Sequence, residues 1–433
     1  MSPTFSSLSI RNYRIYAAGA FVSNIGTWMQ RVAQDWLVLQ LTHSGTALGI
    51  TTGLQLLPSL LLSPIAGVVA DRYPKRTILR ITQLAMAIPA ALLGVLAVTG
   101  VVQAWHVYLL AFVFGVATAF DAPARQSFVV EMVGKGDLAN AVGLNSASFN
   151  SGRMIGPAVA GVMIAALGSG VVATGWVILI NAASYVAVFV SLNLLDTARL
   201  RPSPVVGNRK GAVRDGIRYV RSRPDLILIL MCVFFVGTFG MNFQMTSALM
   251  ATSVFHKGAS EYGILGSIMA VGSLCGALLA ARRTRPRLGM VVVAGMSFAV
   301  LEIVAGLMPN YLSFALILPL LGLSALTMVT SANAMIQMTS SAHMRGRVSA
   351  LYLMIFLGGT PFGAPLIGWI GETYGARWTL LFGGVASMIG ILCATAYYWH
   401  KQGIQRSELR TAARDIRVSY SIRPSPRRVR PSA

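Results

Sequence analysis

The chain of 433 residues is long enough for two or three soluble domains, yet 55% of its residues are hydrophobic and only 11% are charged. This balance excludes an ordinary soluble protein and predicts an all-α membrane protein. The net charge of +22 would suggest a nucleic-acid partner for a soluble protein. Here the basic residues gather at the ends of apolar segments, which indicates a membrane topology and no nucleic-acid partner.

Apolar stretches recur along the chain, and each reaches the roughly 20 residues that cross about 30 Å of hydrocarbon. Twelve such stretches lie near residues 13–40, 46–70, 77–98, 105–125, 139–167, 171–194, 225–252, 259–281, 288–307, 311–336, 347–371 and 376–399. Lys and Arg cluster before the first stretch and after each even-numbered one, whereas the opposite side holds only Lys257 and Arg377. The positive-inside rule therefore predicts twelve transmembrane helices with both termini in the cytoplasm.

A basic segment with two prolines divides the spans into two sets of six. We expect an N-terminal six-helix half over residues 1–195, a basic cytoplasmic linker over 196–224, a C-terminal six-helix half over 225–400 and a disordered basic cytoplasmic tail over 401–433. Within the linker, residues 212–223 suit a short amphipathic helix on the inner membrane surface, with Val213, Ile217 and Val220 against lipid. The tail is expected to meet anionic lipid headgroups rather than nucleic acid, because Tyr420 is the one aromatic residue among its charges.

The two halves share a pattern of glycines. A shift of 207 residues aligns the fifth span with the eleventh and pairs Gly152 with Gly359, Gly156 with Gly363, Gly161 with Gly368 and Gly168 with Gly375. Such a repeat is typical of transporters in which two halves rock around a central site. Small residues at this spacing also suit close helix packing alone, and both interpretations hold together because a rocking interface needs close packing.

Several polar side chains lie within the expected spans. On the first span, a stripe with spacings of three or four residues consists of Asn24, Thr27, Arg31, Gln34 and Asp35. In lipid, such a stripe must face a water-filled cavity or other protein. The fifth span holds Arg153, whose placement costs at least roughly 3 kcal/mol, so we expect the protein to use it. Asp35 either pairs with Arg31 or exchanges partners with Arg153, and these three residues are the candidates for proton coupling.

The loop after the second span reads GVVADRYPKR from Gly67 to Arg76. It resembles the signature loop of the major facilitator superfamily, which closes the cytoplasmic side by placing its aspartate at the start of the eleventh span. Backbone N–H groups at that helix start attract an anion. The resemblance implies this gating role for Asp71, and we expect Arg72 and Arg76 to pair with Asp121 at the inner end of the fourth span.

The fifth span also carries a glycine and proline motif. Gly152, Gly156, Pro157 and Gly161 resemble the antiporter motif of the same superfamily, with Ala160 in place of one glycine. The glycines would allow backbones to approach across the interface between the halves, and the proline would bend the helix. This resemblance implies export by exchange.

Four further segments resemble the transmembrane secretion effector branch of the superfamily, which includes the enterobactin exporter and macrolide efflux proteins. They are Asn24–Arg31, Asp121–Gln126, Asn140–Ser146 and Arg345–Tyr352. The resemblance covers all twelve spans and implies a secondary active exporter in a bacterial inner membrane, which moves a drug-like compound or siderophore by proton antiport. The alternative is an uptake symporter or facilitator of the same fold.

In the resembled fold, the seventh and tenth spans line the cavity, which implies substrate contacts for Asn242, Gln244, Thr330 and Asn333. Glu302, in the peripheral ninth span, has no assigned role. The five histidines are scattered along the membrane edges, so we expect neither a metal site nor an enzyme. The proton gradient is the expected energy source, without a cofactor, and the protein is expected to act as a monomer.

Overall fold

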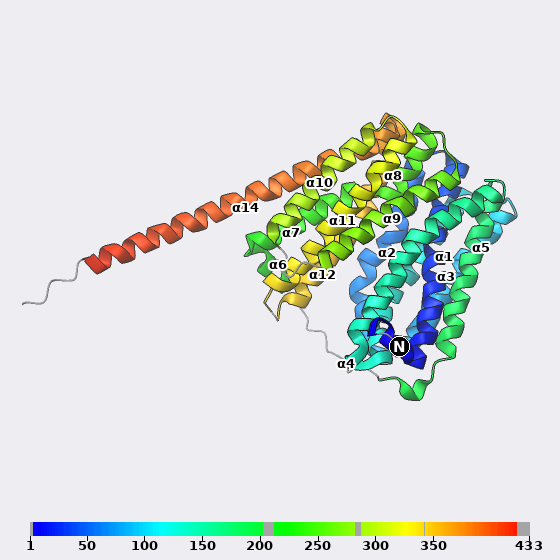
Figure 1. Ribbon diagram of the computed structural model, residues 1–433, viewed down its shortest axis with the longest axis horizontal. Helices are drawn as coiled ribbons and strands as arrows, with labels where there is room; N and C mark the ends of the chain where they lie inside the picture. The colour runs from blue at the N-terminus through cyan, green and yellow to red at the C-terminus, as the bar shows by residue number, and fades with distance from the viewer. Residues whose placement is uncertain (1–2, 202–211, 282–286, 342, 422–433) are drawn as a thin grey trace, which may run out of the picture.

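The computed structural model describes residues 3–201, 212–281, 287–341 and 343–421, which are helical apart from short connections (Figure 1). The first half contains α1 (Arg11–Thr42), α2 (Gly45–Arg72), α3 (Lys75–Val98), α4 (Ala104–Ala166) and α5 (Val171–Asn193). The linker and second half contain α6 (Ala212–Arg221), α7 (Pro224–Phe235), α8 (Phe243–Leu249), α9 (Ala259–Ala281), α10 (Leu288–Leu307), α11 (Tyr311–Thr339), α12 (Arg345–Gly358), α13 (Thr360–Tyr374) and α14 (Ala376–Ser421). The expected all-helical architecture is confirmed over these ranges.

Ten helical segments of the described residues are long and apolar enough to cross a membrane. The expected first and fifth spans are not among them, although both are helical, as α1 and the second part of α4. Each of these two carries the polar side chains or glycines of a proposed site, which lower its hydropathy. The count of twelve spans therefore stays a prediction.

Two helices differ from simple membrane spans. In α4, the expected fourth and fifth spans form one element of 63 residues, broken where Gly134 adopts φ of 71°, a conformation that favours glycine. The expected seventh span is divided into α7, the π-helical turn η3 (Val236–Gly240), α8 and a second π-helical turn, η4 (Met250–Val254). Breaks of this kind in a membrane leave backbone groups that must find other partners.

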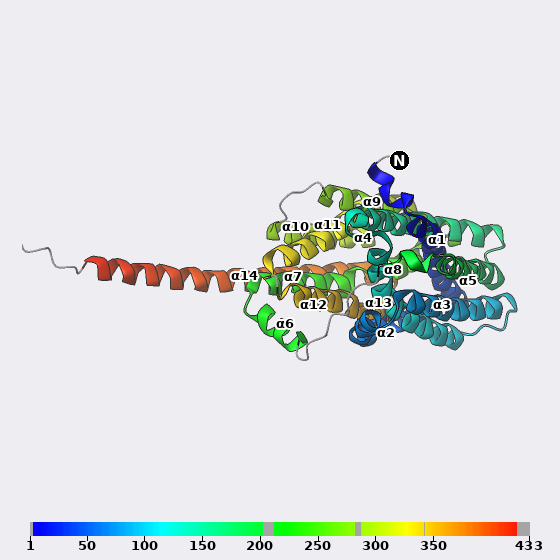
Figure 2. The same ribbon diagram turned by 90° about the horizontal axis from the view of Figure 1, so that it is seen from below.

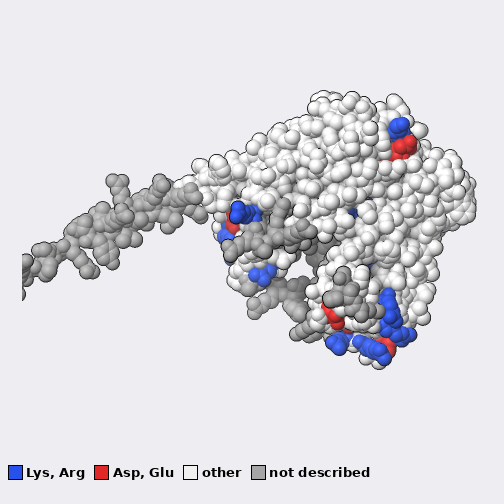
Figure 3. All heavy atoms as spheres, viewed as in Figure 1, with Lys and Arg blue, Asp and Glu red and all other residues white. Residues whose placement is uncertain are grey.

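The helices form two groups that lie side by side (Figure 1). In this view α1 to α5 form one group, and α7 to α14 form the other. The groups pack through α2 against α13 and through α4 against α9. Lys and Arg gather where the N-terminus, the break in α4 and α6 lie (Figure 3). We call this the inner end of the bundle and the opposite end the outer end.

The linker and the tail differ in part from expectation. The linker helix is present as α6, but Val220 is buried while Ile217 is exposed, because Gly216 brings α6 against Leu351 of α12. The side chain of Val213 lies outside the described residues. Helix α14 projects from the bundle as far as Ser421, where we expected disorder (Figure 2). No Gly or Pro interrupts residues 404–421, which allows the helix to continue. Residues 202–211 and 422–433 lie outside the described residues.

Candidate functional site

The halves meet at their outer ends through two close backbone contacts. A Cβ atom added at Gly161 of α4 would overlap the carbonyl of Ala259 at the start of α9. One added at Gly368 of α13 would overlap the carbonyl of Gly45 at the start of α2. The same two helix pairs are also in contact about one turn further in. Backbones this close leave no room for water or a substrate, so the outer end is closed.

The inner end is not closed in the same way. Asp71 and Arg72 of the signature loop are exposed, and their side chains make no hydrogen bond or ion pair with other described residues. A Cβ added at Gly67 would meet no atom within 4 Å. The contact expected between Asp71 and the start of the eleventh span is therefore absent from this arrangement of the described residues. The two halves are thus in close contact at the outer end, and the signature loop does not join them at the inner end.

Asp121 has different partners from those that we expected. Its carboxylate accepts from Arg125, at 2.8 Å and one turn further along α4, and from Thr82 at 2.8 Å and Gln83 at 2.9 Å on α3. Arg76 donates instead to the carbonyls of residues 192 and 193 at the end of α5, at 2.7 and 3.1 Å. The expectation that Asp121 pairs with Arg72 or Arg76 is therefore wrong. The carboxylate of Asp121 forms its ion pair with Arg125 instead.

The antiporter-like motif of α4 has two faces. Gly152 and Gly156 lie against the backbone and side chains of residues 24–29 in α1, within the same half. Pro157 and Gly161 lie against α9 in the other half, where the carbonyl of Pro157 contacts Gly263. We expected all the glycines to face the other half, but the first two pack inside their own.

The glycines of the eleventh span repeat this division. Gly359 and Gly363 contact Thr238 of η3 within the second half, and Gly368 contacts Gly45 of the first half. The aligned glycines thus have equivalent surroundings in the two halves.

Asp35 is the acidic residue of the first-span stripe and contacts the second half. It is 7% exposed, and its Oδ2 accepts a hydrogen bond of 2.8 Å from the hydroxyl of Tyr262 in α9. The ring of Tyr262 also stacks on Trp36, with centroids 6.4 Å apart. A carboxyl from the first half is thereby held by a side chain from the second.

The two arginines of the proposed coupling site have other neighbours. The guanidinium of Arg31 lies 4.9 Å from the ring centroid of Trp28, a cation–π arrangement. Arg153 donates from one terminal nitrogen to Asn150 at 3.1 Å, and its buried Nε has no hydrogen-bond partner among the described residues. No ion pair within 4.0 Å joins Asp35 to either arginine in the described structure. Neither expected pairing is formed here, because Tyr262 holds the carboxylate and Asn150 holds Arg153.

Some of the predicted cavity residues have hydrogen-bond partners for their side chains, and others do not. Asn24 donates to Ser148 at 2.9 Å, and the hydroxyls of Thr27 and Tyr185 lie 3.2 Å apart. Gln34 is buried. In the second half, Thr330 donates to a carbonyl of its own helix, and Asn333 is exposed and accepts from Gln337. The side chains with an unsatisfied buried atom are Asn242 at Oδ1 and Gln244 at Nε2.

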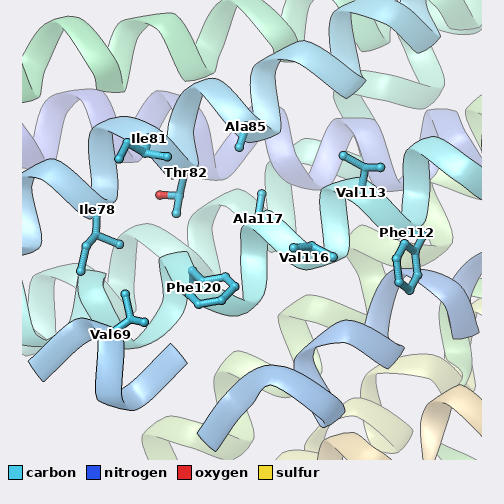
Figure 4. Close-up of a pocket in the computed structure, with 10 residues that line it drawn as sticks. All are labelled: Val69, Ile78, Ile81, Thr82, Ala85, Phe112, Val113, Val116, Ala117 and Phe120. Atoms are coloured by element: carbon cyan, nitrogen blue, oxygen red, sulfur yellow. The ribbon is translucent and has the colours of Figure 1, made fainter. Parts of the chain in front are cut away.

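A cavity of about 380 Å³ lies elsewhere, within the first half (Figure 4). Its lining is apolar and comes from the end of α2, from α3 and from α4, with Phe112 and Phe120 on the α4 side. The hydroxyl of Thr82, its one polar side chain, is already bonded to Asp121. None of the predicted substrate residues lines it, so we do not assign transport to this cavity.

A comparison with known protein families covers nearly the whole chain. The profile of the transmembrane secretion effector family matches residues 2–413. The chain belongs to this family of major facilitator transporters. It is accordingly a multi-pass protein of the bacterial cell membrane.

Relatives of this transporter cover most of its length. The Staphyloferrin A transporter of Staphylococcus aureus (strain NCTC 8325 / PS 47) is 25% identical over 390 residues, which cover 89% of this chain and 95% of the relative. The multidrug efflux pump Tap of Mycolicibacterium fortuitum is 28% identical over 382 residues, covering 84% and 90%. A crystal structure of a bacterial homologue of the lysosomal transporter Spinster, inward-facing and unoccupied, superimposes with a TM-score of 0.69 at 16% identity, covering 92% and 97%. That likeness shows the fold alone.

Three contacts of the transporter were not anticipated from its sequence. Tyr262 was overlooked because a single tyrosine in an apolar span carries no pattern. Glu372, at the end of α13, accepts from the hydroxyl of Ser44 at 2.5 Å and from the backbone N–H of Thr46 at 3.0 Å, and so caps the start of α2 in the other half. Lys75 forms a buried ion pair of 3.1 Å with Glu131. From the sequence, Lys75 is only one of the basic residues of the inner loop.

Proposed function

We propose that this transporter is a secondary active exporter, which moves an amphipathic small molecule out of the cytoplasm by proton antiport and alternating access. The proposal includes twelve spans, both termini in the cytoplasm, and two six-helix halves joined by a basic linker. The observation that carries it is the hydrogen bond between Asp35 and Tyr262, because it joins a titratable group of one half to the other half at the closed outer end.

Opening of the outer end requires this bond to break, because α1 and α9 belong to different halves. Asp35 would then lose its donor and face the outer opening, where it can take up a proton. Return to the closed arrangement would carry the proton inward. Arg31 and Arg153, on the same half, would lower the free energy of the ionised carboxylate after the proton leaves. A buried acid that changes its surroundings during the cycle is the requirement for proton coupling.

The proposed direction and substrate class have separate support. The motif in α4 resembles that of antiporters, and two relatives are named a Staphyloferrin A transporter and a multidrug efflux pump. Trp28 and Phe149 lie edge to face with centroids 5.6 Å apart, beside Arg31, and Phe149 is 49% exposed. Aromatic rings next to a cation suit a substrate that has both apolar and anionic groups. We propose that the protein acts as a monomer and that its basic tail contacts anionic lipid headgroups.

Transport by the purified protein in liposomes tests this function. The assay imposes a pH gradient and compares a siderophore, a macrolide and a cationic dye, with the wild type beside Asp35→Asn. We expect substrate to move against the proton flow, and Asp35→Asn to abolish this movement. Glu261→Gln is the matched control, because Glu261 also lies at the outer end but, among the described residues, its carboxylate accepts a hydrogen bond only from Gly258 of its own segment. Substrate that moves in the same direction as protons would refute antiport and support the uptake symporter.

A further inference from the structure

Glu302 is a fully buried acid that the proposed cycle does not use. It lies in α10 with an exposed fraction of 0%, and neither carboxylate oxygen has a hydrogen-bond partner among the described residues. Helix α10 packs against α7, η3, α11 and α14, so the side chain is inside the second half and not in contact with lipid. It is far along the chain from Asp35, and no contact among the described residues connects the two side chains.

The carboxyl of Glu302 faces the break in the expected seventh span. A Cβ added at Gly240, the last residue of η3, would lie 2.9 Å from Oε2 and 3.0 Å from the hydroxyl of Ser387. One added at Gly383 of α14 would lie 2.8 Å from Oε1 and 2.7 Å from the carbonyl of Phe239. The carboxyl thus lies close against both glycines, and the Ser387 hydroxyl and the Phe239 carbonyl border the same two positions.

These oxygens are not satisfied by one another. The hydroxyl of Ser387 is buried without a hydrogen-bond partner, as are Oγ1 of Thr238 and Oδ1 of Asn242, within the part of the chain that is described. Thr238 and Asn242 flank the point where the helix is interrupted between η3 and α8. The two oxygens that border the same glycines as the carboxyl, the Ser387 hydroxyl and the Phe239 carbonyl, can each accept from a protonated carboxyl or ligate a cation.

The charge of the site leads to the same conclusion. An ionised carboxylate without a partner is very costly in a membrane interior, so the group must be neutralised. No basic side chain of α7, η3, α11 or α14 interacts with Glu302 among the described residues, and the ring of Phe298 borders Gly240 beside it. One carboxylate needs one positive charge. A proton or a Na⁺ ion could supply it.

We propose that Glu302, with Ser387 and the interrupted seventh span, forms a monovalent-cation site in the second half that holds a proton in this conformation. The site is separate from the one at Asp35. Its position next to η3 also connects it to the moving helices, because Thr238 of η3 contacts Gly359 and Gly363. The use of this site in coupling rests on the proposed function, whereas its occupation by a cation does not.

Infrared difference spectroscopy of the purified protein in lipid nanodiscs tests occupation directly. The wild type should show the C=O stretching band of a protonated carboxyl at neutral pH, and Glu302→Gln should lose it. Glu261→Gln and Asp35→Asn should keep it. Loss of the band on addition of NaCl, but not of choline chloride, would identify Na⁺ as the competing occupant. A band that is unchanged in Glu302→Gln would overturn the proposal.

Two further measurements keep the proposal testable if Glu302→Gln does not fold. Ser387→Ala should shift the pH at which the wild-type band disappears, because the serine hydroxyl is a neighbour of Oε2. A wild type without any protonated-carboxyl band, at every pH and NaCl concentration, would refute the site. Failure of antiport in liposomes would refute the proposed function but would leave these spectra, and so the occupied site, unaffected.

Discussion

Replacement of Glu372 by Gln should loosen the closed outer end. The carboxylate joins the end of α13 to the start of α2 through two hydrogen bonds, from Ser44 and from the N–H of Thr46. A hydrogen bond to a charged group contributes about 1.5 to 3 kcal/mol, but this side chain is exposed, so its contribution is smaller. The negative charge at the start of a helix adds about 0.3 kcal/mol or more. We therefore expect the substitution to reduce the free energy that favours the closed arrangement by about 1 kcal/mol, which raises the ratio of open to closed molecules about fivefold.

Electron–electron double resonance between two spin labels at the outer end would measure this ratio. Val101 and Leu312 are suitable positions, because they lie near the outer ends of the two halves with exposed fractions of 58% and 67%. Glu372→Gln should increase the long-distance population about fivefold, and Ser44→Ala should produce part of this effect. Glu261→Gln is the control and should leave the distances unchanged. A distance distribution in Glu372→Gln identical to that of the wild type would refute the role assigned to this contact.

Three other substitutions test the packing and the charges. Gly368→Ala should prevent closure of the outer end, seen as loss of the short distance between the same labels, whereas Gly143→Ala, where an added Cβ meets no atom within 4 Å, should not. Lys75→Ala leaves its buried acidic partner without this cation and should destabilise the protein by about 3 kcal/mol in thermal unfolding. Arg199→Ala, in an ion pair where the arginine is 72% exposed, should cost less than about 1 kcal/mol, and equal losses would contradict the reasoning. Arg153→Ala should abolish transport in liposomes while membrane insertion stays normal. A fully active variant would show that Arg153 contributes only to helix packing.

The glycine repeat was the most informative pattern in the sequence. The alignment of Gly152 with Gly359 and of Gly161 with Gly368 predicted that the two spans are equivalent, and their surroundings are equivalent in the structure. Glycines report on close backbone approach wherever it occurs, so the repeat identified which residues approach another helix. It could not say which helix they approach, because that depends on the angle at which neighbouring spans cross.

The partners of the charged residues were much less predictable. Asp35 belongs to the polar stripe of the first span and is buried, but its partner Tyr262 follows it by 227 positions and belongs to no motif. Asp121 bonds to Arg125, one turn away on the same helix, whereas Arg76 of α3 donates to the carbonyls at the end of α5. Hydropathy also identified α1 less clearly than other spans, because the residues that suggest function make the helix more polar.

The two backbone contacts at the outer end also restrict the path of the motion. One contact lies at Gly161 and Ala259, and the other at Gly368 and Gly45. A rotation about the line through these two contacts would swing the inner ends apart with little displacement at the outer surface, although the contacts one turn further in would have to slide. The halves can therefore vary the width of the inner opening without sliding past each other at the outer surface. A molecule that wedges between either pair of backbones would displace the axis of rotation itself, and so would block transport without entering the substrate cavity.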